Sequence, residues 1–359
     1  MAGIDESNAP VSLFGLDNRN KRGMAIDLKH PDGRNILYKL VADADIFISN
    51  LPKKALERLK MDYDSLSSLN RRLIYAAASG YGNNGPHADK PGFDATAFWA
   101  RSGLMSSLAP DEHHPPVPQP CAGIGDHTSG LALFGGIAMA LYHREKTGNG
   151  QQVDVSLLGV GTWITSSGLQ ATLSLGWEKV SKVRKPRSES VNPLVNFYKT
   201  RDGKWLYLLF LPDDPYWGPL CEAAGRADLE HDERFDTRDH RLANNIELIK
   251  IIDEIFLERD LDQWAELLDG HGLIWTHVPM NFEEVVNDPQ VHANDHIVER
   301  QHPSFGPAKI ITSPIRLNKI VPPIRRFAPE LGQNNEEVLL ELGYTWEDIE
   351  KLKEGGVIL

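Results

Sequence analysis

Short apolar runs alternate with amphipathic stretches in the first part of the chain. Residues 33–44 carry apolar side chains at helical spacing, and the run at 45–49 is short and rich in residues that favour strands. Residues 52–70 predict two short helices, and residues 72–79 predict a second buried strand. Helices that alternate with short buried strands favour a layered α/β domain with a parallel sheet.

Turn-forming residues dominate the pattern from 80 to 120, where one helical segment is expected at 93–108. A long apolar helix is predicted next, over about residues 127–144. It is expected to stop at 146–150, KTGNG, because a cation and a glycine satisfy the last carbonyl groups of a helix. Residues 151–158 predict the start of a further strand.

A second region begins after a polar, basic stretch at 178–191, which we interpret as a linker or a mobile loop. Residues 196–210 predict a hairpin around a turn of sequence RDG. Helical stretches run from about 216 to 268, residues 272–279 predict a strand, and residues 281–294 predict a capped helix. We expect these elements to form a smaller α/β module.

The chain has 359 residues, which is too long for one small core, so two domains are expected. Residues 334–358 predict a helix, a turn and a second helix. We therefore expect a large domain over residues 1–190 and a small domain over residues 192–290. The C-terminal segment, residues 291–359, is expected to return to the large domain.

Composition and charge narrow the classes of function. Apolar residues make up 41% of the chain and charged residues 25%, which is ordinary for a globular protein in water. The formal net charge of −12 argues against general binding to nucleic acids or membrane surfaces, because these surfaces are themselves anionic. No apolar run approaches the roughly 20 residues of a membrane span. With only Cys121 and Cys221 and no signal peptide, a cytoplasmic location is expected.

The stretch SGYGNNGP places Gly80, Gly82 and Gly85 in a G-x-G-x-x-G pattern after a predicted strand. In a dinucleotide-binding turn, these glycines open a helix whose N-terminal amides bind the pyrophosphate. Here Pro86 and Pro91 prevent that helix, and no acidic residue for the ribose follows about 20 residues later. We therefore interpret the glycines as a loop that needs positive φ angles, and expect no nicotinamide cofactor.

Motifs for several other chemistries are missing from the sequence. It contains neither the G-x-S-x-G turn of serine hydrolases nor a P-loop. His113 and His114 are adjacent and precede two prolines, whereas zinc-binding histidines usually lie one helical turn apart or pair with cysteines. This pair predicts a solvated loop, and no metal site is expected.

Asp126 in GIGDHTSG is the most informative polar residue, because it lies between glycines where the long helix is predicted to begin. One interpretation is a helix N-cap, a position that aspartate often occupies. The other is a carboxylate nucleophile, kept ionised by the helix dipole, beside backbone N–H groups that are free to hold an oxyanion. The two interpretations are compatible.

Several segments of the chain resemble the family III coenzyme A transferases. These segments are NRNKRGMAIDLKHPDGR, LVADADIFISN, LNRRLIYAAASGYGNNGP, KPGFDATAF, GDHTSGLALFGGIAMALYHREKTGNGQQVDVSLL, NDPQVHAN and ELGQNNEEVLLELGYTWEDIEKLKEGGVI. The resemblance covers essentially the whole chain, and FDATAFWARSG is most similar to the branch that acts on 2-hydroxy acids and aryl acids. It implies a Rossmann-like large domain built from N- and C-terminal parts, a smaller α/β domain, and an interlocked homodimer.

The resemblance also implies a reaction that moves coenzyme A from an acyl-CoA donor to a carboxylate acceptor. Asp126 matches the nucleophilic aspartate of the family. It would attack the donor thioester to form a mixed anhydride and then carry coenzyme A as an aspartyl thioester. A second anhydride would pass the coenzyme A to the acceptor. This covalent chemistry needs no metal ion and no redox cofactor.

Further residues match positions that bind coenzyme A in the family. Asn20, Lys21 and Arg22 match a segment that lines the coenzyme A site. Asn50 and Arg58 match positions beside the nucleotide and the pyrophosphate, and a guanidinium group suits phosphate oxygens. Without the resemblance, we would interpret each of these cations as a solvated surface residue.

The glycine loop leads through Lys90 to Phe93 and Asp94, which are expected to border the acyl-CoA. Related racemases carry a histidine at the position of Phe93 as an acid/base group, and a phenyl ring cannot move a proton. Phe93 therefore favours transfer over the alternative of an acyl-CoA racemase or epimerase. Asp94 is either a second active-site carboxylate or a hydrogen-bonding loop residue.

Members of the family usually begin with a segment that precedes the position of NRNKR and carries the first strand of the nucleotide-binding domain. This chain is expected to lack that segment. The expectation motivates a third alternative, a catalytically silent partner subunit.

Overall fold

The structure, a computed structural model, describes residues 12–109, 114–180 and 186–359. It divides into two compact units, each with its own core. Unit 1 takes the described residues within Met1–Lys182, Glu299–Ile311 and Ile315–Leu359, and unit 2 takes those within Val183–Val298 and Thr312–Pro314. Unit 2 is therefore an insertion in the sequence of unit 1.

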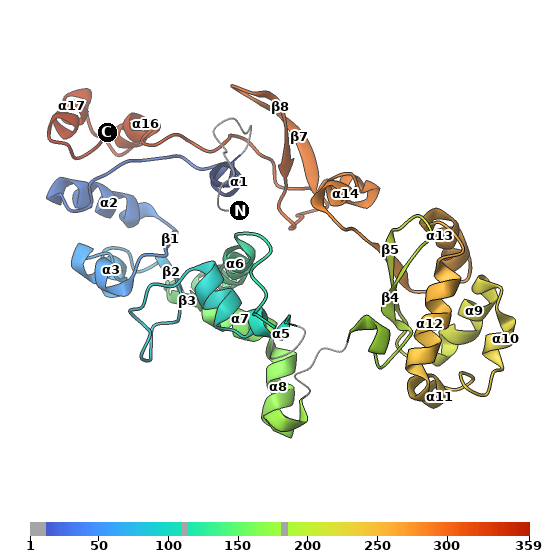
Figure 1. Ribbon diagram of the computed structural model, residues 1–359. Helices are drawn as coiled ribbons and strands as arrows, with labels where there is room; N and C mark the ends of the chain where they lie inside the picture. Colours follow the sequence, from blue (N-terminus) through green and yellow to red (C-terminus); the bar gives the residue numbers. More distant parts are fainter. Residues whose placement is uncertain (1–11, 110–113, 181–185) are drawn as a thin grey trace. The chain divides into compact units, whose positions relative to one another are not determined.

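Unit 1 contains a three-stranded parallel sheet in the order β1-β2-β3 (Figure 1). The strands are Ile46–Ser49, Ile74–Ser79 and Gln152–Ser156. Ala76 in the central strand lies opposite Ile48 of β1 and Val153 of β3. The predicted strands and the predicted parallel sheet are thus confirmed.

Two short helices connect β1 to β2, as the pattern at 52–70 predicts. They are α3 (Lys53–Leu59) and α4 (Tyr63–Leu69). The side chain of Asp62 caps α4 by accepting a hydrogen bond from the backbone N–H of Ser65.

The long helix α6 (Ile124–Thr147) directly precedes β3 and packs on the sheet. Its Leu133 and Ile137 join Ile74 and Ala76 of β2 in one buried cluster. Because apolar residues four apart lie on one face of a helix, this face covers the strands. This packing against the sheet fixes the position of the N-terminus of α6.

Both ends of α6 lie outside the predicted range of 127–144, and a glycine flanks each end. Gly123, at φ +86°, occupies the position before the first turn, and Gly148, at φ +77°, ends the last turn. The backbone N–H of Gly148 donates to the carbonyl oxygen of Arg144 at 2.7 Å. The predicted glycine stop is confirmed, and three further residues at each end belong to the helix.

The remaining helices of unit 1 are shorter than α6. They are α1 (Leu13–Asn18), α2 (Pro31–Asp43), the π-helix η1 (Asp94–Ala100), α5 (Leu104–Ser107), α7 (Leu157–Ile164), α8 (Ser166–Leu175), the 3-10 turn η2 (Trp177–Lys179), α16 (Asn335–Glu341) and α17 (Trp346–Glu354). The single helix expected at 93–108 is wrong. Two elements, η1 and α5, replace it because Gly103 between them has φ +89°, which a right-handed helix does not accommodate.

The C-terminal segment packs against α2, and α16 and α17 lie beside it in Figure 1. Ile36 of α2 shares a buried cluster with Leu339 of α16 and Ile349 of α17. A backbone bridge joins Ile26 to Ile358. The helix, turn and helix predicted at 334–358 are confirmed.

Unit 2 is built on a three-stranded antiparallel sheet in the order β4-β5-β6. The strands are Val195–Lys199, Trp205–Leu209 and Trp275–Val278. Tyr198 and Leu206 on the buried face pack with Trp264 of a covering helix. The predicted hairpin and the predicted third strand are confirmed.

The helices of unit 2 include those that cover this sheet. They are the 3-10 turn η3 (Arg187–Glu189), α9 (Asp214–Ala224), α10 (Ala227–Glu230), α11 (Arg238–Ala243), α12 (Asn245–Phe256), α13 (Leu261–Gly270), α14 (Phe282–Val286) and α15 (Pro289–Ala293). A two-stranded sheet, β7 (Ile297–His302) and β8 (Gly306–Ile311), follows α15 in the sequence, and all of it from Glu299 onward belongs to unit 1.

The structure bears on the helix expected at 281–294 and on the linker expected at 178–191. The capped helix expected at 281–294 is two helices, because Asp288 caps a new helix and Pro289 occupies its first position. Of the expected linker at 178–191, residues 181–185 lie outside the described residues. His113, of the predicted solvated histidine pair, also lies outside them. Arg187, beyond this gap, pairs with Asp253 of α12 at 2.5 Å and so belongs to the packed part of unit 2.

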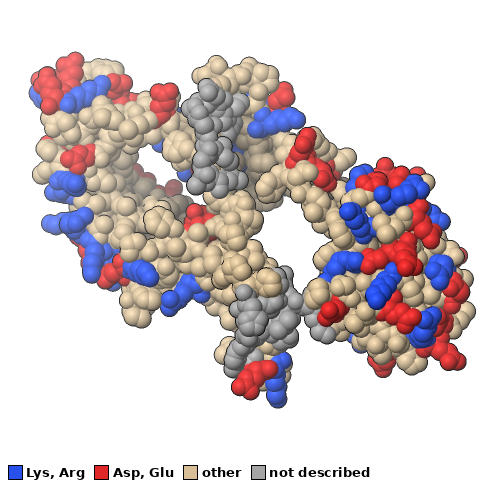
Figure 2. All heavy atoms as spheres, viewed as in Figure 1, with Lys and Arg blue, Asp and Glu red and all other residues tan. Residues whose placement is uncertain are grey.

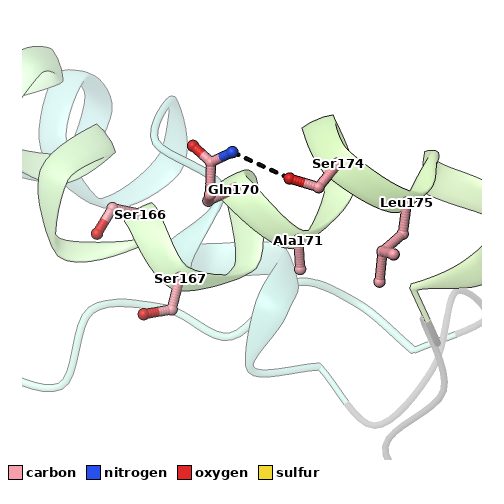
Figure 3. Close-up of a pocket in the computed structure, with 6 residues that line it drawn as sticks. All are labelled: Ser166, Ser167, Gln170, Ala171, Ser174 and Leu175. Atoms are coloured by element: carbon pink, nitrogen blue, oxygen red, sulfur yellow. Dashed lines mark hydrogen bonds between the residues drawn. The ribbon is translucent and has the colours of Figure 1, made fainter.

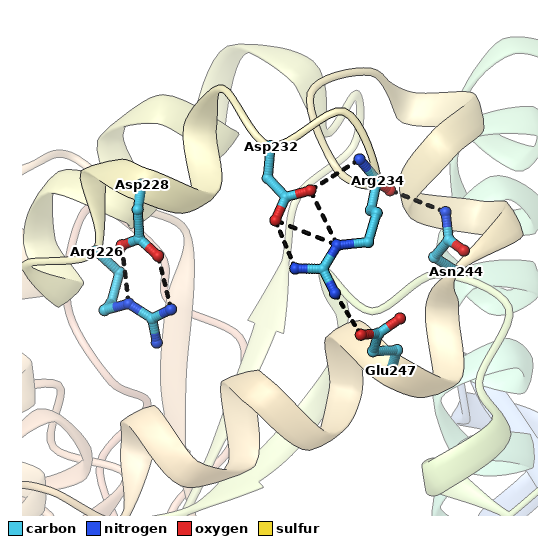
Figure 4. A network of polar contacts seen from close by, with 6 residues as sticks. All are labelled: Arg226, Asp228, Asp232, Arg234, Asn244 and Glu247. Atoms are coloured by element: carbon cyan, nitrogen blue, oxygen red, sulfur yellow. Dashed lines mark hydrogen bonds and ion pairs between the residues drawn. The ribbon is translucent and has the colours of Figure 1, made fainter.

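Acidic and basic side chains are interspersed over unit 2 (Figure 2). Figure 4 shows two of the resulting networks, in which Arg226 binds Asp228 while Arg234 binds both Asp232 and Glu247. Arg234 holds the pKa of Asp232 at about 2. These pairs are exposed, so solvent and salt screen them. None of the helices in the described ranges has the length and hydropathy that crossing a membrane requires.

Candidate active site

A cavity of about 880 Å³ opens in unit 1 beside the carboxyl ends of β1 and β2. Asn50 directly follows β1 and Ser79 ends β2, and both line it. The loop after β2, the N-terminal part of α6, and residues of α3, α4 and β3 form the rest of the wall. Ligands of open α/β sheets usually bind outside the carboxyl ends of the strands, so this cavity is the best candidate for the active site.

Five of the residues predicted for the site line this cavity. They are Asn50, Lys90, Phe93, Asp94 and Asp126. They come from the end of β1, from the segment between β2 and η1, and from α6, so the fold brings together positions far apart in the sequence. Phe93 is 72% exposed, which leaves its ring free to contact a ligand.

The other four predicted residues lie outside the lining. They are Asn20, Lys21, Arg22 and Arg58. Arg58 lies in the last turn of α3 and is exposed. Lys21 donates a hydrogen bond to Asn18, and Arg22 pairs with Glu337 and Glu341 of α16.

Asn20 fastens the C-terminal segment instead of bordering the cavity. It has φ +64°, a left-handed conformation that asparagine tolerates better than most residues. Its side-chain oxygen accepts a hydrogen bond from the backbone N–H of Arg325 at 2.7 Å, and its amide donates to the carbonyl of Pro323 at 3.0 Å. The contacts of Asn20 are therefore structural within unit 1.

Asp126 lies in the first turn of α6, two residues after the helix begins. The N-cap interpretation is wrong, because Gly123 occupies the cap position. Partial burial, followed by the charge of Asp94, raises the pKa of Asp126 above its ordinary value. Asp17 raises it further, while His127 lowers it. These effects oppose the helix dipole, which favours the anion.

Asp94 is a buried carboxylate that binds both the loop before α6 and the first turn of α6. Its Oδ1 accepts a hydrogen bond from the backbone N–H of Gly125 at 2.9 Å, and its Oδ2 accepts one from Nε2 of Gln119 at 2.6 Å. Only 8% of the residue is exposed. Asp94 was interpreted either as a second active-site carboxylate or as a hydrogen-bonding residue, and the structure shows the hydrogen bonds. The contact also occupies the Gly125 N–H, which the sequence interpretation left free for an oxyanion.

Gly125 is confined between Asp94 and Phe98. A Cβ atom at this position would lie 2.3 Å from Oδ1 of Asp94 and 2.4 Å from Cγ of Phe98. Such distances are far shorter than any van der Waals contact, so the position requires glycine for space. The glycine before Asp126 thus allows α6 to approach η1 closely.

Two polar residues beside the site carried no signal in the sequence. Gln119 lies in a proline-rich loop with no recognisable motif. His127 follows Asp126 and places its Nε2 3.1 Å from Oδ1 of Asp17 in α1. Both contacts join segments far apart in the chain, which is why local patterns could not indicate them.

The glycine loop after β2 turns without forming a helix, as predicted. Gly82 and Gly85 have φ angles of +93° and +90°. Gly80 packs directly against Gly92, because a Cβ at Gly80 would lie 2.7 Å from the Cα of Gly92. At the edge of the cavity, Asp89 of this loop pairs with Lys54 of α3 at 2.8 Å.

A second hollow, of about 620 Å³, lies along α8 (Figure 3). Its lining consists of six residues of that helix, Ser166, Ser167, Gln170, Ala171, Ser174 and Leu175. Gln170 donates a hydrogen bond to Ser174 at 3.0 Å within the same helix. Because this lining holds no titratable group, it offers neither an acid, a base nor a charged nucleophile. Among the described residues, no cluster of three His, Cys, Asp or Glu side chains could hold a metal ion.

Comparison with known proteins gives a consistent result along the chain. A family model described as CoA-transferase family III matches residues 3–335. Among curated proteins, the chain is 34% identical to (R)-2-hydroxy-4-methylpentanoate CoA-transferase of Clostridioides difficile, over 96% of this chain and 85% of that protein. It is 31% identical to cinnamoyl-CoA:phenyllactate CoA-transferase of Clostridium sporogenes, over 95% and 82% of the two chains.

Solved structures agree at the level of the fold. The structure of Rv3272 from M. tuberculosis matches with a TM-score of 0.77 at 25% identity, over 90% of this chain and 85% of that chain. A CAIB/BAIF family protein from Brucella suis matches with a TM-score of 0.75 at 26% identity, over 92% and 83%.

Proposed function

This chain belongs to CoA-transferase family III, and we propose that it transfers coenzyme A from an acyl-CoA thioester to a free carboxylic acid through covalent intermediates on Asp126. The observation that carries the proposal is the position of Asp126. An exposed carboxylate in the first turn of a helix lines the cavity, and its raised pKa makes it a more basic nucleophile than an ordinary aspartate.

The first half of the reaction loads coenzyme A onto the protein. A carboxylate oxygen of Asp126 attacks the thioester carbon, the carbon–sulfur bond breaks, and a mixed anhydride and the thiolate of coenzyme A form. The thiolate then attacks Cγ of Asp126 and releases the donor acid as its carboxylate. The product is an aspartyl-CoA thioester.

The second half reverses these steps with the acceptor. The acceptor carboxylate attacks Cγ, the thiolate leaves, and a second anhydride forms. Attack of the thiolate on the acceptor carbonyl gives the new acyl-CoA and restores the carboxylate of Asp126. All charges and atoms balance without a metal ion or a redox cofactor.

We further propose that the acids are 2-hydroxy or aryl acids. The relatives named above carry the names of a 2-hydroxy acid, of phenyllactate and of a cinnamoyl thioester. The exposed ring of Phe93 offers an apolar face in the cavity for such an acyl group.

For coenzyme A itself, we propose binding along the edge of the cavity that α3 forms. Figure 2 shows Lys and Arg side chains gathered on the edge of unit 1 where α3 lies. Lys53, Lys54 and Arg58 are exposed on this helix, and Lys90 lines the cavity. Cations of this kind attract and bind phosphate groups.

We also propose that the chain forms an interlocked homodimer with a Rossmann-like large domain in each subunit. Helices α6, α7 and α8 expose large apolar side chains, including Met139 at 75%, Trp163 at 76% and Leu173 at 80%. Exposed apolar side chains in such numbers are typical of interfaces. Light scattering after size exclusion tests this proposal, since a monomer at micromolar concentration would contradict it.

The central test is chemical capture of the covalent intermediate. Incubation with an acyl-CoA donor and hydroxylamine should convert Asp126 to a hydroxamate, which mass spectrometry of the peptide detects. Asp126→Ala should give no adduct and no transfer. Equal turnover by Asp126→Ala would exclude the mechanism. Deuterium exchange at the α-carbon without transfer would instead indicate a racemase.

A further inference from the structure

We infer that Gln119 is a positioning residue for this reaction, because its amide holds Asp94 where Asp94 binds the first turn of α6. The inference rests on the proposed function, since it concerns the orientation of Asp126. It adds a residue that lies outside the lining of the cavity.

The contacts form a chain that ends beside the nucleophile. Gln119 donates to Oδ2 of Asp94 at 2.6 Å, and Oδ1 of Asp94 accepts from the N–H of Gly125 at 2.9 Å. Gly125 is directly followed by Asp126. If the carboxylate of Asp94 rotated, the N–H of Gly125, in the peptide group that joins Ile124 to Gly125, would lose its partner.

The loop that carries Gln119 is itself anchored. The indole N–H of Trp99, a buried residue of η1, donates to the carbonyl oxygen of Val117 at 2.8 Å. The N–H of Val117 donates to the carbonyl oxygen of Met105 at 2.9 Å. Gln119 lies two residues after this anchored position, so little conformational freedom is lost when its amide binds Asp94.

Close packing transmits the position of Asp94 to α6. The backbone of Gly125 lies against both Asp94 and Phe98, with no space for a Cβ atom. Asp94 borders the cavity on one side and contacts the backbone of Gly125 on the other, so a change in the orientation of its carboxylate alters the contact with α6. Without Gln119, Oδ2 of this largely buried carboxylate would also lack its hydrogen bond, which favours a different rotamer.

The chemistry makes orientation matter at Asp126. One of its oxygens must attack the thioester carbon, and its Cγ must later be reached by the thiolate. Both steps need the plane of the carboxylate to be held within a narrow range of angles. Gln119 does not touch the reacting atoms, so its effect should appear in kcat and hardly in the KM for acyl-CoA.

The test compares three substitutions at Gln119 with one control substitution elsewhere. Gln119→Met removes the amide donor, and we expect kcat to fall about tenfold with KM within about twofold. Gln119→Glu should lower kcat more than Gln119→Met, because the new carboxylate would lie against the carboxylate of Asp94 and repel it. Gln119→His keeps an N–H donor and should recover part of the loss. Gln301→Met, at an exposed glutamine outside the cavity lining, is the control and should leave kcat unchanged.

A second measurement needs no substrate. Hydrogen exchange of the Gly125 amide should be faster in Gln119→Met than in the wild type. If kcat and exchange both equal the wild-type values, the inference is wrong. If kcat falls without faster exchange, Gln119 acts by another route, and if exchange rises without loss of kcat, orientation does not limit the reaction; each outcome overturns the inference.

The two proposals fail in different ways. If the wild-type protein transfers no coenzyme A, the proposed function fails, and the exchange measurement alone decides whether Gln119 holds the first turn of α6. If Gln119→Met does not fold, Gln119→Ser replaces it, because serine keeps a polar loop but cannot reach Asp94. The same outcomes then apply.

Discussion

The carboxylate of Asp94 binds the backbone N–H of Gly125 at 2.9 Å, one residue before Asp126. The same carboxylate is, after burial, the main cause of the raised pKa of Asp126. One side chain thus contributes to both the position and the basicity of the proposed nucleophile.

Gly125→Ala should abolish most activity and destabilise the fold. The new Cβ would lie 2.3 Å from Oδ1 of Asp94, so either the hydrogen bond or the packing of α6 on η1 must break. Overpacking of this kind costs about 1–3 kcal/mol. Chemical denaturation measures the loss, and turnover assays measure the activity.

The matched control is Gly270→Ala, also at a helical glycine. No atom lies within 4 Å of a Cβ built there. This variant should keep full activity and near wild-type stability. If the two substitutions behave alike, the close approach at Gly125 is not important.

Asp126→Asn should raise stability at neutral pH while it abolishes transfer. Because folding raises the pKa of this carboxyl, its contribution to stability is fully present below the unfolded-state pKa and is lost as pH rises through the folded-state pKa. The uncharged variant avoids that loss. The gain should be about 0.5 kcal/mol at pH 7, since solvent screens an exposed group.

Urea denaturation at several pH values checks the sign. The advantage of Asp126→Asn should shrink as pH falls toward the ordinary pKa of aspartate. Asp348→Asn is a control of opposite sign, because hydrogen bonds from Thr345 lower the pKa of Asp348. That variant should be less stable than the wild type at neutral pH, and its deficit should shrink in acid.

Gly80→Ala should harm turnover more than coenzyme A binding. Its Cβ would lie 2.7 Å from the Cα of Gly92, which would displace the loop that leads to Phe93 and Asp94. We expect kcat to fall about tenfold, while calorimetry shows a smaller change in the Kd for coenzyme A. Gly85→Ala tests backbone strain alone, because open space surrounds that position. If both substitutions lower only the thermal stability and leave turnover unchanged, the loop has a structural role alone.

Arg58→Ala should raise the KM for acyl-CoA and leave kcat nearly unchanged. A lost charge-assisted contact to phosphate corresponds to roughly a tenfold change in affinity, and the effect should weaken at high salt. Initial rates at low and high salt measure it. Arg226→Ala, which breaks an exposed pair with Asp228 in unit 2, is the control. Equal KM values for the two variants would remove Arg58 from the coenzyme A site.

Periodicity predicted most strands and the long helix, because their burial patterns are local. Ala76 lies in a short apolar run, which is typical of a buried strand. The helix at 93–108 was wrong because Gly103, with its positive φ angle, divides it, and sequence alone does not distinguish such a glycine from a helical one. Gln119 was missed because its partner is 25 residues earlier and no pattern links them.

The sequence likewise indicated some residues of the site but not the long-range contacts around it. Resemblance to a family indicated Asp126, and the fold places it in the cavity with Asn50 and Lys90. It could not indicate that Asn20 would bind the C-terminal segment, because that contact spans more than 300 residues of chain. Contacts over such separations depend on the complete tertiary structure.

The union of α2 with the C-terminal helices has a consequence for biosynthesis. Ile36 leaves the ribosome long before its partners Leu339 and Ile349 are translated. At ordinary rates of elongation, the roughly 300 intervening residues take about 15–60 s to synthesise. During that time unit 2 can fold, while the apolar face of α2 remains without its cover. The nascent chain therefore exposes this hydrophobic surface until the last two helices are made and bury it.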